Sequence, residues 1–78
     1  MYRNKAVLEA IQRVLNSRQM TVDQWEESIG WSRGTVLSSL QPPDELSINR
    51  NIKLSAAHLG IDIAKFLDLV RTIDEEFG

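Results

Sequence analysis

Apolar residues recur at spacings of three and four along most of the chain, which is the pattern of amphipathic helices. The segment at about 3–17 carries the clearest stripe: Val7, Leu8, Ile11, Val14 and Leu15. Similar stripes follow at about 22–29, 33–40, 48–59 and 63–77. No stretch shows the alternation expected of a strand. The pattern therefore predicts an all-α domain, a compact five-helix architecture.

Local signals mark the start and end of the second helix. Thr21 and Gln24 have the spacing of a capping box, in which each side chain bonds to the backbone amide of the other residue. Met20 and Trp25 occupy the positions of a hydrophobic staple. We expect Gly30 to end this helix, because glycine adopts left-handed backbone angles without steric cost.

The later helices carry similar signals. Ser32 is expected to cap a third helix, within which Gly34 would lie. The segment 41–46, "QPPDEL", then breaks the helix, because its prolines lack amide donors. Ser47 and Asp62 are the expected caps of the fourth and fifth helices.

Composition bounds the size and class of the protein. The chain has 78 residues, of which 42% are apolar and 26% charged, as in a single globular domain spanning 1–78. It has no cysteine, which excludes disulfides and thiolate metal sites, and His58 is its only histidine. The apolar runs are too short for a membrane span, and the polar start does not resemble a secretory signal. A cytoplasmic protein without cofactor or metal is expected.

Charge is distributed unevenly. The formal net charge of −2 argues against a protein that coats nucleic acid unspecifically. However, most basic residues lie in the first two-thirds of the chain, while 62–78 is acidic. This distribution suits a protein whose basic side faces phosphate. Charges of opposite sign are also found apart on ordinary solvated surfaces.

The segment 21–40, "TVDQWEESIGWSRGTVLSSL", is followed by a proline-containing loop and then by "SINRNIKLSAAHLGIDIAKFLDL". Together they resemble the helix-turn-helix family of lambda repressor and Cro. Within the motif, Gly30 matches the turn glycine, Trp31 the apolar residue after it, Ile29 the apolar residue before it, and Val36 the branched anchor of the second helix. The resemblance implies a lambda-repressor-like fold with its helix-turn-helix at about 21–40.

Two positions depart from the family pattern. Glu26 stands where the family usually has a small residue, often alanine, at the point where the two motif helices touch. We expect its side chain to tilt outward or to find a partner. In the reading helix, the family's second apolar anchor would fall at Ser39. Here the apolar residue is Leu40, one position further on.

The resemblance implies that the third helix enters the major groove of double-stranded DNA. The residues then expected to face bases are Ser32, Arg33, Gly34, Leu37, Ser38 and Gln41. Arg33 is the leading candidate, because a guanidinium bonds the O6 and N7 atoms of guanine bidentately. The residues expected at phosphates are Arg18, Thr21, Gln24, Asn49, Arg50, Asn51 and Lys53.

The apolar stripe of 63–77 extends beyond what a minimal core needs, which suggests a homodimer contact. The residues proposed for that interface are Phe66, Leu69, Val70, Ile73 and Phe77. The alternative is that this helix folds back over the first one. The resemblance implies a small, sequence-specific, double-stranded DNA-binding transcriptional regulator of the repressor-like type found in phages and mobile elements. No enzymatic activity, no membrane contact and no small-molecule ligand are expected.

A second hypothesis keeps the fold but replaces the partner. Net acidity, a single arginine in the reading helix, Glu26 and the exposed candidate Leu37 would also suit a protein-binding module. Such a module would inhibit or modulate another protein without reading DNA. Steep salt dependence of DNA affinity would distinguish the first hypothesis from the second.

Overall fold

Helices dominate the architecture, in agreement with the all-α prediction. The computed structural model describes residues 2–41, 46–47 and 49–78. In chain order its elements are β1 (Tyr2–Arg3), α1 (Asn4–Ser17), α2 (Val22–Ser28), α3 (Thr35–Ser39), β2 (Leu46–Ser47), α4 (Asn49–Leu59) and α5 (Ile63–Glu76).

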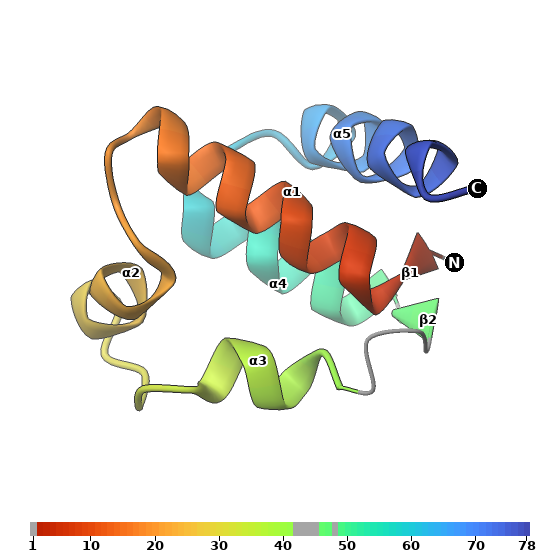
Figure 1. Cartoon of the computed structure of the whole chain (residues 1–78). Coiled ribbons are helices and arrows are strands. Elements are labelled where there is room, and N and C mark those ends of the chain that lie inside the picture. Colours follow the sequence, from red (N-terminus) through yellow and green to blue (C-terminus); the bar gives the residue numbers. More distant parts are fainter. Residues whose placement is uncertain (1, 42–45, 48) are drawn as a thin grey trace.

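Two short strands are a departure from the sequence prediction, which contained none. β1 and β2 pair antiparallel, with Tyr2 opposite Ser47 and Arg3 opposite Leu46. A two-residue strand is too short to leave a recognisable alternation in the sequence. The pairing fastens the start of α1 to the connection between α3 and α4 (Figure 1).

The core forms around α1, which packs most extensively against α5 (Figure 1). Ala6 and Ala10 are completely buried although neither belongs to the large apolar stripe of this helix. Such small side chains allow neighbouring helices to approach closely. The same cluster continues into the other helices through six further buried residues. They are Trp25 in α2, Val36 in α3, Leu40 directly after α3, and Ile52, Ala56 and Leu59 in α4.

The position of α5 corrects part of the dimer prediction. Phe66, Val70 and Ile73 are fully buried within the core of the single chain. They belong to the helix that packs on α1, so they are core residues rather than residues free to meet a second copy. Of the other two predicted interface residues, Leu69 is half-buried against the core and Phe77 is 44% exposed.

Polar contacts join the end of α5 to the first helix. The backbone amide of Arg3 donates to Asp74 Oδ1 at 3.2 Å, and Arg13 Nη2 donates to Glu76 Oε2 at 3.0 Å. The hydrogen bond with Glu76, followed by that with Glu9, raises the pKa of Arg13 above its usual value. Because that value is already strongly alkaline, Arg13 stays charged throughout the neutral pH range.

Three helices end in the same backbone motif. After α1, α2 and α4 the chain passes through a left-handed residue: Gln19 (φ 57°), Gly30 (φ 82°) and Gly60 (φ 70°). In α2 the amide of Trp31 then donates to the carbonyl of Glu26 at 2.8 Å, as in a Schellman motif. The prediction that Gly30 ends the second helix is confirmed.

Over the described ranges, 2–41, 46–47 and 49–78, every helix is too short or too polar to cross a membrane.

Candidate nucleic-acid interface

The candidate interface is built on the corner formed by α2, the turn and α3. α2 begins as predicted: Thr21 Oγ1 accepts from the amide of Gln24 at 3.1 Å, and Gln24 Oε1 accepts from the amide of Thr21 at 2.9 Å. Both residues are exposed. Their oxygen atoms are used within this turn, which leaves the threonine hydroxyl proton and the glutamine amide protons as donors for a phosphate.

Two tryptophans anchor the corner to the end of α4. Trp25 is buried, and its Nε1 donates to the carbonyl of His58 at 3.4 Å. Trp31 is half-buried and makes edge contacts with Trp25 and with the His58 imidazole, at centroid separations of 5.8 and 4.7 Å. Both indoles therefore belong to the packed structure, as expected for tryptophans beside a turn.

Glu26 is the residue that joins the two motif helices. It is only 1% exposed, and its carboxylate faces the start of α3. Glu26 Oε1 accepts from the amide of Gly34 at 3.1 Å, and Oε2 accepts from the amide of Val36 at 2.8 Å. Of the two outcomes expected for Glu26, the structure shows the second, because its partner is the backbone of α3.

The turn before α3 brings two corrections to the prediction. Ser32 does not cap α3; its carbonyl accepts instead from the amide and the hydroxyl of Thr35, at 3.1 and 2.6 Å. Gly34 is not inside the helix but precedes it as the N-cap residue, with a left-handed φ of 89°. α3 therefore starts at Thr35 and is shorter than predicted, and Glu26 accepts from the amide of Val36, its second residue, as an N-cap side chain would.

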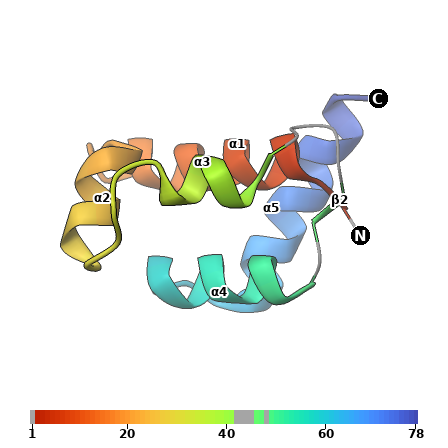
Figure 2. The ribbon, with the colours of Figure 1, turned by 90° about the horizontal axis from the view of Figure 1, so that it is seen from below.

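The residues predicted to meet bases lie on α3 and in the segments that flank it: Leu37 and Ser38 belong to the helix, Ser32, Arg33 and Gly34 precede it, and Gln41 follows it. Val36 and Leu40 point into the core, whereas Leu37 is 49% exposed. Figure 2 looks onto the outer face of α3, which lies in front of α1 with α2 at one end of it. The exposed members of the predicted set are Ser32, Arg33, Leu37, Ser38 and Gln41, while Gly34 is half-buried.

Arg33 has an acidic neighbour that sequence reasoning missed. Its side chain is 82% exposed, and its Nε lies 3.7 Å from Asp23 Oδ2. The two residues line a surface hollow together with Glu27 and Trp31. Such a solvent-exposed ion pair stabilises by at most about 1 kcal/mol. Arg33 can therefore break its ion pair with Asp23 for a stronger partner, although the carboxylates of Asp23 and Glu27 stay close to it.

The predicted phosphate contacts are spread over the end of α1, the start of α2 and α4, and Lys53 lines a hollow toward α5 with Ile63 and Leu67. Arg18 is exposed at the end of α1, and Arg50 and Lys53 are exposed on α4. Asn51 is half-buried and lines a pocket between α3 and α4. The side chains of Asn49 and of the predicted cap Ser47 lie outside the described part of the chain.

Comparison of the chain with protein-family models, with curated proteins and with solved structures returned no match. Within the residues that the structure describes, no cluster of histidine, cysteine, aspartate and glutamate side chains could hold a metal ion.

Proposed function

We propose that the protein is a sequence-specific, double-stranded DNA-binding regulator that reads the major groove with the outer face of α3. The observation that carries this proposal is the clamp of Glu26 on the amides of Gly34 and Val36. It fixes α3 relative to α2, so that the exposed side chains of α3 are presented from a defined backbone. Accurate presentation is needed for base recognition, because each bidentate contact depends on hydrogen-bond geometry.

The chemistry of α3 and of the residues that flank it suits a short stretch of base pairs. Arg33 offers a bidentate donor pair for guanine, Gln41 can pair with adenine, and Leu37 offers an apolar contact for a thymine methyl group. A good bidentate contact discriminates by about 1–3 kcal/mol, more than the exposed Asp23–Arg33 pair contributes. Breaking the exposed Asp23–Arg33 pair therefore costs Arg33 little when it turns to a guanine edge.

The small size of α3 implies a second copy on the operator. Its five residues, Thr35–Ser39, span about 7.5 Å and can follow only two or three base pairs. A homodimer would place two such helices about 34 Å apart on a near-palindromic site. Arg18, Arg50 and Lys53 would supply phosphate contacts for each copy.

The test begins with selection of double-stranded fragments from a random pool at low salt. The wild-type chain should enrich a sequence, and its affinity should fall with a log–log salt slope of about −3 per copy, since three cations release counterions. Arg33→Ala should flatten the sequence preference, whereas Lys53→Ala should weaken all sequences alike. Arg71→Ala, which removes the same charge on α5 beside Asp68, is the matched control and should change neither. No retention of any duplex at low salt would refute the proposal.

The acidic neighbours of Arg33 favour protein binding as a second candidate function. Asp23 and Glu27 would repel phosphate but would attract a basic protein surface, and the half-exposed Leu37 would add apolar contact. Asp23→Asn separates the two functions. It frees Arg33 and removes a negative charge, so DNA affinity should rise severalfold if α3 reads DNA. Unchanged or absent DNA binding in this variant would favour the protein-binding module.

A further inference from the structure

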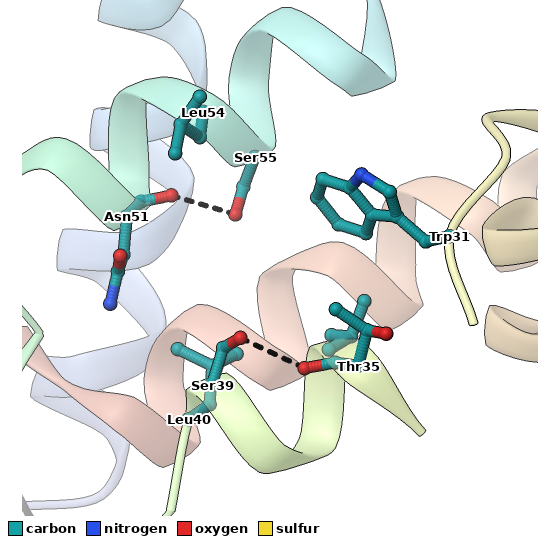
Figure 3. A pocket seen from close by; sticks show the side chains of 8 residues that line it. Trp31, Thr35, Ser39, Leu40, Asn51, Leu54 and Ser55 are labelled. Carbon is teal, nitrogen blue, oxygen red and sulfur yellow. Dashed lines mark hydrogen bonds between the residues drawn. The ribbon is translucent and has the colours of Figure 1, made fainter. Parts of the chain in front are cut away.

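A pocket of about 140 Å³ lies between the inner side of α3 and α4. Figure 3 shows its lining side chains, with Trp31 at one end and α3 and α4 as the two walls. The lining residues are all uncharged: Trp31, Thr35, Val36, Ser39, Leu40, Asn51, Leu54 and Ser55. An enclosed, apolar engineered cavity of about 150 Å³ binds benzene; this pocket has a similar volume but is open to solvent on one side, so it could hold an aromatic ring that stays partly exposed.

The apolar part of the pocket is held in place by the core. Val36 and Leu40 are buried, and Leu54 contributes a side chain that is 42% exposed. The Trp31 indole is fixed by its edge contacts with Trp25 and His58. Its six-membered ring is turned toward the pocket (Figure 3). These contacts keep an aromatic surface available without the need to order a mobile side chain on binding.

The three hydroxyl groups of the pocket offer acceptors rather than donors, and the side-chain amide of Asn51 adds a further acceptor and an NH2 group. Thr35 Oγ1 donates to the carbonyl of Ser32 at 2.6 Å, Ser39 Oγ to that of Thr35 at 2.9 Å, and Ser55 Oγ to that of Asn51 at 2.8 Å. The latter two bonds are drawn in Figure 3. Each hydroxyl proton is thus used by the backbone of its own chain segment, while the oxygen lone pairs remain available.

We propose that this pocket binds a small, neutral aromatic molecule of one or two rings that carries a single N–H donor. The ring packs against Trp31, Leu40 and Leu54, and the N–H donates to a hydroxyl oxygen of Ser39 or Ser55. A charged ligand is disfavoured because none of the lining residues carries an opposite charge. This site differs from the expectation from sequence, which included no small-molecule ligand, and it does not depend on the DNA-reading function.

The experiment titrates indole into the whole chain without DNA, observed by amide and indole N–H NMR signals. Indole should cause saturable shifts around Trp31, Ser39 and Ser55, with a dissociation constant of about 1 mM for so small a ligand. Benzofuran has the same shape but an oxygen in place of the N–H, and it should bind about three- to tenfold more weakly. Equal or tighter binding of benzofuran would overturn the assigned ligand class.

Variants connect the binding to the pocket. Ser55→Leu fills the space between α3 and α4 and should abolish the indole shifts. Ala57→Leu places the same side chain at an exposed position of α4 outside the lining and should leave them intact. If Ser55→Leu does not fold, Ser39→Leu fills the same space from α3. Shifts that do not saturate, or that persist in a folded pocket-filling variant, would refute the site. Because no DNA is present, this result is independent of the test of the proposed function.

Discussion

Replacement of Glu26 by alanine is the sharpest test of how the corner is held. Alanine is what the helix-turn-helix family often has at this position, so resemblance alone would predict a neutral or stabilising change. The contacts of Glu26 predict the opposite. Its carboxylate is 1% exposed and accepts two amide hydrogen bonds from α3, at 2.8 and 3.1 Å.

The magnitude follows from the groups that the substitution leaves behind. The amide of Val36 is buried, and losing its partner costs about 1–3 kcal/mol, whereas the part-buried amide of Gly34 can turn to water. Removal of the buried Cγ methylene adds about 0.8 kcal/mol, and the space that the carboxylate leaves adds a cavity cost. Relief of the buried charge offsets part of this sum. We expect Glu26→Ala to lower the free energy of unfolding by about 3 kcal/mol, out of about 4–12 kcal/mol for a chain of this length.

Urea denaturation followed by circular dichroism measures this change. With a slope of about 1 kcal/mol per M, the midpoint should fall by about 3 M. Glu26→Gln, which keeps one acceptor, should lie between alanine and wild type. Glu27→Ala is the matched control, because its side chain is exposed, and it should stay within about 0.5 kcal/mol of wild type. A Glu26→Ala protein as stable as wild type would refute the clamp.

Three further substitutions test other parts of the fold. Gln19→Gly should stabilise the protein by about 1 kcal/mol and raise the thermal midpoint by about 4–8 °C, because Gln19 has a φ of 57°; Arg18→Gly, beside it, should bring no gain. Gly34→Ala should cost only about 1 kcal/mol in urea denaturation, since its φ is 89° but a Cβ would meet open space; a loss above about 3 kcal/mol would contradict that geometry. Ile73→Ala should cost about 3 kcal/mol at every protein concentration, because Ile73 fills the core of one chain, whereas the exposed Phe77→Ala should cost less than about 1 kcal/mol. A loss that varies with concentration for Ile73→Ala would instead indicate an interface.

The sequence was sufficient where an interaction is local. The capping box of Thr21 and Gln24 and the glycine end at Gly30 involve residues within a few positions of one another, so residue type and spacing determine them. The exposure of Ser38 also follows from the helical period, once Val36 and Leu40 are taken as the buried positions, whereas Arg33 and Gln41 lie outside α3.

The sequence was insufficient where a partner comes from elsewhere in the chain. The stripe containing Phe66, Val70 and Ile73 shows that one side of α5 must be covered, but not whether α1 or a second copy covers it. Glu26 is visible as a departure from a family pattern, yet its reach to α3 depends on the angle between two helices. The pocket is likewise invisible, because its walls come from the turn, α3 and α4.

The hydrogen bond between Arg3 and Asp74 has a topological consequence. It joins residues 71 positions apart, so the folded chain is already close to a closed ring. A short peptide linker across this junction would demand little new geometry of the native state, while it would remove loop-closure freedom from the unfolded state. For a ring of this length the chain-entropy gain is about 4 kcal/mol. The domain is therefore suited to backbone cyclisation and to circular permutation, with new ends placed in its exposed turns.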